Sequence, residues 1–304
     1  MSTFSPSSVP IKATSSASPA SVTGPVAELR RATAVVWSVA GLVVGAVVGF
    51  LIGDVIGLIV GMIVLGAVAC LVGLALVGRF VEGALGSVMA HQSAREINAE
   101  DSPRLFNLLQ GLCAAAGVST PRVALVDDAS INVFVAADPA RTGRGELVVT
   151  RGLVESLERI EMEGVVAVCL ARLRSGLAEA QTIAEALSVG SPWFVPGPVR
   201  RRIASAAASG QAIFDADVKG VGITRYPPGL ASAFQKMLGA STAVAAARAG
   251  GSQLWLANPS GESDGGGDDE TGNAARRPVS GSRVDASNDE RPPLAERLAL
   301  LREI

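Results

Sequence analysis

The stretch ATAVVWSVAGLVVGAVVGFLIGDVIGLIVGMIVLGAVACLVGLALVG, residues Ala32 to Gly78, decides the architecture, because it carries a single charged residue, Asp54. A helix needs about 20 apolar residues to cross a hydrocarbon core of about 30 Å. The stretch is long enough for two such helices, Ala32–Gly53 and Val55–Gly78, with a tight turn at Gly53 and Asp54. We therefore predict a two-span transmembrane hairpin; one long signal-anchor or a buried hydrophobic hairpin are the alternatives.

Positive charge flanks this hairpin only at its open end. Arg30 and Arg31 precede it and Arg79 follows it, whereas the turn carries no Lys or Arg. Cytoplasmic flanks of membrane helices are enriched in Lys and Arg. Both termini and the remaining domain are therefore expected in the cytoplasm, with the lipid bilayer as the first partner of the chain.

Glycine recurs at every fourth position within the apolar stretch. The set is Gly41, Gly45, Gly49, Gly53, Gly57 and Gly61. Small residues at this spacing line one helix face and let two backbones approach closely. The pattern predicts that the two spans pack on each other. The alternative is a homo-oligomer that forms through this glycine-zipper face.

The overall composition argues against nucleic acid as a partner. The 304 residues carry 26 Lys and Arg against 28 Asp and Glu, for a net charge of −2, so the chain lacks a broad basic surface. Three cysteines do not suggest a disulfide framework, which indicates a reducing compartment. The Ser-rich segment 1–27 and the Gly-, Ser- and Asp-rich segment 257–292 are expected to be disordered.

Beyond residue 80 the sequence alternates helical patterns with a few short strands. Apolar residues at helical spacing predict helices over Ala94–Gly117, Leu153–Arg159, Glu161–Ser175, Ala212–Gly220, Gly229–Leu238 and Leu294–Arg302. Runs bounded by turn residues predict strands at Arg122–Asp127, Asn132–Ala136 and Glu146–Thr150. We expect an α+β fold: the hairpin 28–80, a mostly helical domain 81–256 with a small sheet of about three strands, and a helix within 293–304 packing on it.

The ordered set of segments from about residue 30 to the C-terminus resembles the HtpX-type membrane zinc metallopeptidases. The similar segments are AREINAEDSPRLFNLL (94–109), PRVALVDDASINVFVA (121–136), ELVVTRGLVESL (146–157), FDADVKGVGITRYPPGLASAFQKM (214–237), LWLANP (254–259) and PPLAERLALL (292–301). The resemblance implies a metallopeptidase-like domain at the inner (plasma) membrane of a bacterium, and a role in protein quality control.

The active helix of that family reads H-E-x-x-H, in which two imidazoles hold zinc and the Glu activates a bound water. The similar helix here is EMEGVVAVCLARLRSG, Glu161–Gly176. Its register places Val168 and Arg172 at the His positions and Cys169 at the Glu, and Ile213 stands at the third ligand. Val and Ile have no lone pair and Arg is permanently charged. We therefore predict no catalytic residue, no zinc or other cofactor, and a pseudo-protease that is not an enzyme.

Few other residues offer a replacement for the missing ligands. His91 is the only histidine and precedes the domain, and Cys169 is more typical of a small buried hydrophobe than of a nucleophile. The resemblance gives Asp217 a supporting role beside the family's metal site, and Asp215 is nearby in the sequence. We hypothesise that Arg172 pairs with Asp217 or Asp215, so that an ion pair joins two helices in place of the metal.

Three functions are compatible with these residues. The leading one is an inactive HtpX-type homologue that binds or regulates membrane proteins or an active protease paralogue. Its partner would add as a strand to an exposed sheet edge, formed by Glu146, Leu147, Val148, Val149 and Thr150. Asn132 would help to hold the peptide or the groove wall. The alternative for the strand and for Asn132 is that they are ordinary parts of the sheet. The alternatives are an active metallopeptidase with non-standard ligands or chemistry at Cys169, and a structural glycine-zipper membrane protein.

Overall fold

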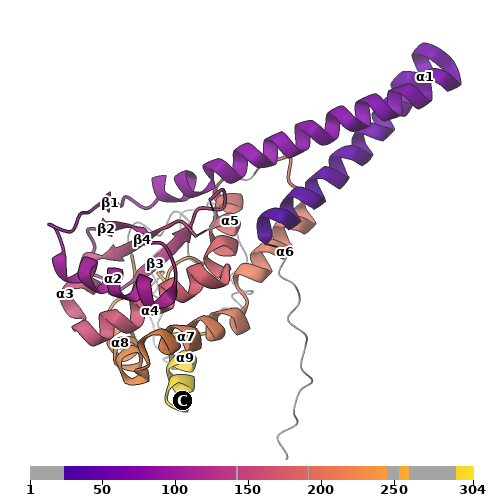
Figure 1. Cartoon of the computed structure of the whole chain (residues 1–304). Helices are drawn as coiled ribbons and strands as arrows, with labels where there is room; N and C mark the ends of the chain where they lie inside the picture. Colours follow the sequence, from indigo (N-terminus) through magenta and orange to yellow (C-terminus); the bar gives the residue numbers. More distant parts are fainter. Residues whose placement is uncertain (1–23, 142, 191, 245–252, 260–291) are drawn as a thin grey trace, which may run out of the picture.

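A computed structural model describes residues 24–141, 143–190, 192–244, 253–259 and 292–304 (Figure 1). These residues form a long apolar helical element that projects from a mostly helical body with one small mixed sheet. The predicted disorder of segments 1–27 and 257–292 falls almost entirely outside the described residues and stays a prediction.

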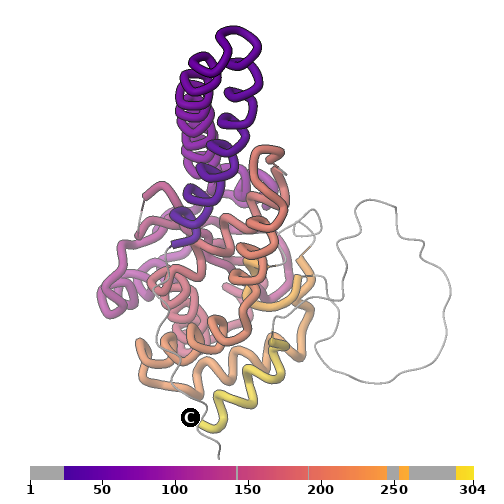
Figure 2. The backbone as a smooth tube through the Cα atoms, turned by 90° about the vertical axis from the view of Figure 1, so that its right-hand side faces the viewer, coloured from indigo at the N-terminus to yellow at the C-terminus, as the bar shows by residue number. Residues whose placement is uncertain are grey.

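Helix α1 (Pro25–Ala90) is interrupted at Gly53 and Asp54, whose backbone angles are not helical. Asp54 has φ of +55° and ψ of −140°, a left-handed region that non-glycine residues enter almost only in turns. The chain reverses here, so α1 consists of two antiparallel arms that lie side by side (Figures 1 and 2). The reversal occurs at the residues where the sequence pattern places the turn.

Glycines bring the two arms of α1 into direct backbone contact. A Cβ added to Gly45 would collide with the Gly61 carbonyl oxygen, and one added to Gly49 would collide with that of Gly57. Nothing lies within 4 Å of a Cβ added to Gly53, which sits in the turn. The repeated glycines are therefore used within one chain, because only a residue without a side chain allows so close an approach.

Beyond the body, α1 presents apolar side chains outward. Large exposed residues run along it from Val35 to Leu74, and Ile52 near the tip is 82% exposed. By length and composition α1 is able to cross a membrane, and it is the one helix among the described residues that is. An exposed apolar surface of this extent supports association with a membrane.

The sheet contains four strands, one more than the sequence pattern suggests. Its order is β1-β2-β4-β3, with β1 (Arg95–Glu96), β2 (Arg122–Val126), β3 (Val133–Ala137) and β4 (Gly145–Thr150). β4 pairs in parallel with β2 on one side and antiparallel with β3 on the other. The prediction that Glu146–Thr150 is an open edge is therefore wrong: β4 is a central strand, buried along its whole length, as its continuous apolar run allows.

Eight helices complete the described part of the body. They are α2 (Pro103–Ala116), α3 (Arg151–Ser156), α4 (Arg159–Ser175), α5 (Leu177–Gly190), α6 (Gly197–Ala207), α7 (Gly210–Thr224), α8 (Pro227–Gly239) and α9 (Leu294–Leu301). The predicted helix over Ala94–Gly117 is wrong at its start, since Arg95 and Glu96 pair with β2 and the helix begins at Pro103. The sequence pattern also missed α5, which is buried nearly all round and so lacks a polar face.

Helix α4 lies at the centre of the body, where it packs against α7, α8, α2 and β3. Two glycines, one in α7 and one in α4 itself, allow this close packing. A Cβ on Gly220 of α7 would meet the backbone of Val168 in α4, and a Cβ on Gly164 of α4 would meet Leu230 of α8. The helix that the resemblance marks as the active one is therefore enclosed by other helices at Val168.

Candidate functional site

Three buried charged side chains lie where α4, α7 and α9 converge. Arg297 of α9 donates from Nε to Oδ2 of Asp217 and from Nη2 to Oδ1, both at 2.7 Å. The two side chains are each 1% exposed, and Nη1 of Arg297 donates to the Leu256 carbonyl at 2.7 Å. This two-pronged geometry is the strongest form of an arginine–carboxylate pair, so Arg297 and Asp217 join α9 to α7.

The predicted pair of Arg172 with Asp217 or Asp215 is wrong. Arg297 takes both oxygens of Asp217, while Asp215 lies on the exposed side of α7 and accepts from Gln211 at 3.1 Å. Nη1 of Arg172 donates instead to the Leu254 carbonyl at 3.5 Å. Within the described residues its Nε and Nη2 have no hydrogen-bond partner.

Arg297 was missed although the sequence contains a signal for it. In LAERLALL it lies three residues after Leu294 and one before Leu298, which puts it on the apolar face of a short amphipathic helix. An arginine on an apolar face needs a buried partner. The structure confirms that Leu294, Arg297, Leu298 and Leu301 are the buried residues of α9.

The charges in this cluster do not balance. Two guanidinium groups, of Arg172 and Arg297, surround the single carboxylate of Asp217. Burial, and after it the charge of Arg297, lowers the pKa of Arg172 to about 10. Burial also raises the pKa of Cys169 to about 11, although the arginines act in the opposite direction. At neutral pH the site is therefore cationic and its thiol stays protonated.

A zinc ion does not fit the residues at this junction. Val168 and Ile213 are buried hydrocarbon side chains without donor atoms, and α7 contacts α4 directly at Val168. Cys169 would need to be a thiolate to bind zinc, and the guanidinium groups repel a dication. Across the described ranges no group of three or more His, Cys, Asp or Glu side chains is placed to hold a metal. His91 lies elsewhere, on the exposed end of α1, where its Nδ1 is 2.7 Å from the Ser87 carbonyl.

Asn132 joins β3 to a later segment of the same chain, Leu254–Ala257, in which Trp255 forms an isolated β-bridge. Its Oδ1 accepts from the backbone N–H groups of Ala257 at 3.1 Å and of Val133 at 3.0 Å. Its Nδ2 donates to the carbonyls of Ala257 at 3.1 Å and of Thr242 at 3.0 Å. Asn132 is fully buried, so its side chain acts as a clamp on this segment.

The clamped segment lies along the outer side of β3. Trp255 forms an antiparallel bridge with Phe134, and the two rings meet edge to face at 4.7 Å. The N–H of Leu256 donates to the Val133 carbonyl at 2.7 Å. The outer edge of β3 therefore accepts backbone pairing at Trp255 and Leu256, and in this structure the pairing segment comes from the chain itself.

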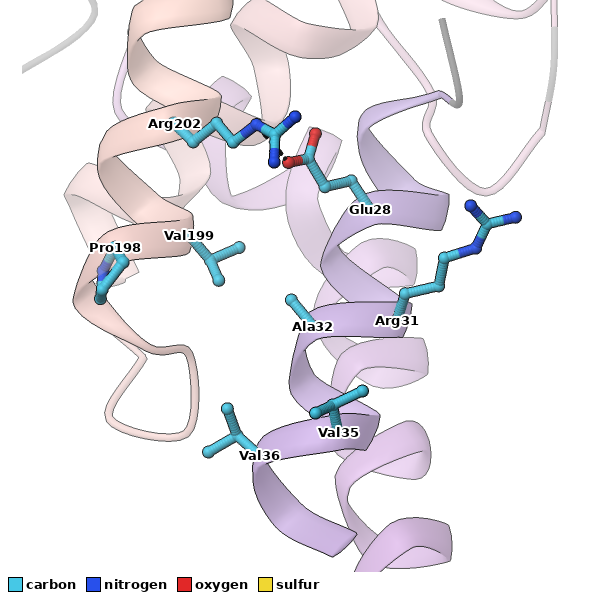
Figure 3. Close-up of a pocket in the computed structure, with 8 residues that line it drawn as sticks. All are labelled: Glu28, Arg31, Ala32, Val35, Val36, Pro198, Val199 and Arg202. Atoms are coloured by element: carbon cyan, nitrogen blue, oxygen red, sulfur yellow. Dashed lines mark ion pairs between the residues drawn. The ribbon is translucent and has the colours of Figure 1, made fainter. Parts of the chain in front are cut away.

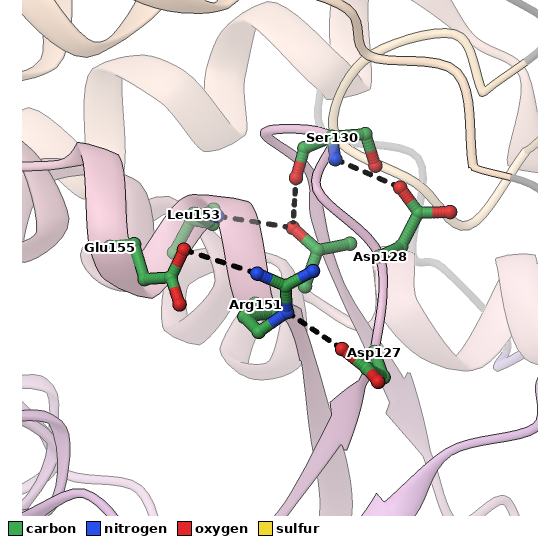
Figure 4. Close-up of polar contacts among 7 residues, drawn as sticks. Asp127, Asp128, Ser130, Arg151, Leu153 and Glu155 are labelled. Carbon is green, nitrogen blue, oxygen red and sulfur yellow. Dashed lines mark hydrogen bonds and ion pairs between the residues drawn. The ribbon is translucent and has the colours of Figure 1, made fainter.

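A second polar network fixes the turn that follows β4 (Figure 4). Thr150 caps α3, since its Oγ1 accepts from the Leu153 N–H at 3.3 Å, and the same oxygen lies 2.6 Å from the Ser130 carbonyl. Arg151 pairs with Asp127 at 2.7 Å. Thr150 is thus committed to local structure and is not available to a partner strand.

Comparison with known proteins finds relatives that share one name. The chain is 29% identical over 203 residues to "Protease HtpX homolog" of Dictyoglomus thermophilum, covering 57% of this chain and 66% of that protein. For the protein of the same name from Tropheryma whipplei strain Twist the identity is 28% over 218 residues, covering 62% and 73%. For that of Listeria monocytogenes serotype 4b strain CLIP80459 it is 26% over 235 residues, covering 63% and 77%. No family model and no solved structure matches the chain.

These names contradict one prediction and confirm another. Relatives named as proteases suggest a peptidase, so the prediction that the chain is not an enzyme is overturned. That prediction rested on the side chains that stand at the motif positions, Val168, Cys169, Arg172 and Ile213. The ordered resemblance is confirmed, because the matches cover much of the chain at 26% to 34% identity. By its sequence the chain is similar over much of its length to proteins named as HtpX protease homologues.

Proposed function

We propose that the chain is a membrane-anchored HtpX-type protein that binds extended polypeptides beside its central helix α4. The observation that carries this proposal is the outer edge of β3, which already holds Leu254–Ala257 as an added segment. Backbone pairing at a sheet edge binds polypeptides with little regard to their sequence. The relatives named as proteases support polypeptide as the class of ligand, and hydrolysis is therefore assayed together with binding.

The membrane part of the proposal is supported by α1. Its outward side chains are apolar over the length of both arms, and each arm is long enough to cross a bilayer. In this proposal the two arms of α1 each span the membrane, and Arg30, Arg31 and Arg79 lie on the cytoplasmic side beside the body. Because the glycines contact one another within the chain, they favour packing of the two arms over a homo-oligomer formed through the same face.

The proposal contains no resident zinc ion. The positive charge of Arg172 and Arg297 at the junction and the protonated thiol of Cys169 support this zinc-free proposal. The polypeptides in question are membrane proteins or a protease partner in the same membrane, since the anchor restricts the body to that surface.

The test measures binding and cleavage of fluorescein-labelled casein by the full-length protein in vesicles. A synthetic peptide copying residues 253–259, QLWLANP, is expected to compete with casein for the β3 edge, whereas a scrambled peptide of the same composition is not. Failure of casein to bind, or equal competition by both peptides, refutes the proposed site. Cleavage that disappears with a chelator and returns with zinc contradicts the zinc-free part alone.

A further inference from the structure

An open groove of about 620 Å³ separates the first turns of α1 from helix α6 (Figure 3). Its lining includes Arg31, Val35 and Val36 of α1 and Pro198, Val199 and Arg202 of α6. Arg202 and Glu28 lie at one end and form an ion pair of 2.8 Å, while Val35 and Val36 lie at the other. The groove is therefore amphipathic along its length, charged toward the body and apolar toward the projecting arms.

The apolar end of the groove opens onto the exposed surface of α1. Val35 is 62% exposed and Val36 is 47% exposed, and they are the first large exposed apolar residues of the helix. Aromatic residues gather at the same level: Nε1 of Trp37 donates to the Phe194 carbonyl at 3.2 Å, and the Trp37 ring lies 5.6 Å from that of Trp193. Trp193 is 80% exposed. Exposed tryptophans of this kind sit where acyl chains meet headgroups.

The charged end of the groove has a surplus of positive charge. Its lining contains two arginines, Arg31 and Arg202, and one acid, Glu28. Glu28 pairs with Arg202, whereas Arg31 makes no ion pair with any residue in the described part of the chain. Arg30 and Arg201 add exposed positive charge on either side. Arg31 borders the groove on α1 with its side chain directed away from α6 (Figure 3), so one uncompensated guanidinium at the rim attracts an anion to this end.

We propose that this groove binds an anionic phospholipid, with the phosphate at Arg31 and Arg202 and an acyl chain along Val35, Val36 and Val199. A soluble anion would leave the apolar half of the groove unused, and a zwitterionic lipid would not use the surplus charge. The inference rests on the membrane anchoring in the proposed function.

The test uses the full-length protein in phosphatidylcholine vesicles that contain a minor fraction of acyl-brominated lipid. Bromine quenches Trp37 and Trp193 beside the groove, whereas Trp255, buried in the body, gives a constant background. Brominated phosphatidylglycerol is expected to bind about fivefold more tightly than brominated phosphatidylcholine. This factor corresponds to about 1 kcal/mol for each basic side chain near an anionic membrane surface.

Variants of opposite sign separate this proposal from a structural role of the groove. Arg31→Gln is expected to remove the fivefold preference and Glu28→Gln to raise it about fivefold further. Arg174→Gln is the control, because Arg174 lines a different cavity together with Lys219 and Arg225. Equal quenching by both lipids, or a change in the same direction for Arg31→Gln and Glu28→Gln, overturns the inference. Failure of the protein to float with pure phosphatidylcholine vesicles refutes the membrane anchoring itself, and this inference with it.

Discussion

Replacement of Asp217 by Asn tests whether one buried carboxylate holds the three-helix junction together. The side chain is almost isosteric, so packing is kept while the charge is removed. Arg297 then loses its partner for two bonds of 2.7 Å at 1% exposure, and Arg172 already lies buried beside it with two unpaired N–H groups. Breaking a buried pair by removing one partner costs about 3–5 kcal/mol, and two buried cations without a carboxylate place this change at the upper end.

The expected loss is large enough to measure by thermal unfolding. For a body of this size each kcal/mol lowers the melting temperature by about 2–4 °C, so Asp217→Asn, at about 5 kcal/mol, is expected to lower it by about 10–20 °C. Fluorescence of Trp255, fully buried against Phe134, reports the unfolding of the body in detergent. Asp215→Asn is the matched control, because Asp215 is exposed on the same helix.

A second substitution, Arg172→Met, removes the surplus positive charge beside Asp217. Arg172→Met removes a guanidinium whose one bond is 3.5 Å long, and a hydrophobic replacement of a poorly paired buried ion is often neutral or stabilising. It is therefore expected to leave the native protein unharmed and to recover part of the stability lost in Asp217→Asn. The reasoning is refuted if Asp217→Asn lowers the melting temperature no more than Asp215→Asn does, or if Arg172→Met adds to its loss.

Three further outcomes follow from burial and close contact. Gly45→Val is expected to lower the melting temperature or to separate the two arms of α1, since the added Cβ meets the Gly61 carbonyl. Gly78→Val is expected to do neither, because a Cβ at Gly78 has open space around it. Equal effects of the two substitutions would contradict the contact between the arms. Burial raises the pKa of Glu185 from 4.5 to about 7, although His91 lowers it, so stability is lost as pH rises from about 4.5 to 7. Glu185→Gln is therefore expected to raise the free energy of unfolding by up to about 3 kcal/mol at pH 8 and by little at pH 5. A gain in stability that does not depend on pH would show that burial of the Glu185 charge is not its cause. Because Cys169 is fully buried with a pKa of about 11, maleimide at pH 7.5 is expected to label it only after unfolding, as mass spectrometry of the modified peptide can show.

The local features of the fold follow from the sequence, while its non-local pairings do not. Gly53 and Asp54 interrupt an otherwise uniform apolar stretch, and Pro103 starts α2 after a helix-start signal. The position of β4 between β2 and β3 depends on a crossover connection that no local pattern encodes. For the same reason the partner of Asp217 was predicted on the neighbouring helix α4, whereas Arg297 lies 80 residues away.

The segment clamped by Asn132 also determines which polypeptides can reach the outer edge of β3. A covalently joined segment competes at a local concentration in the millimolar range, and the apparent affinity of an incoming chain falls with the fraction of time that the edge is open. Polypeptides in solution, such as casein or a free peptide, are therefore expected to occupy the edge only at concentrations that approach this local value. A polypeptide anchored in the same bilayer also has a high local concentration near the edge. The occupied edge therefore favours the binding of membrane-anchored polypeptides over soluble ones.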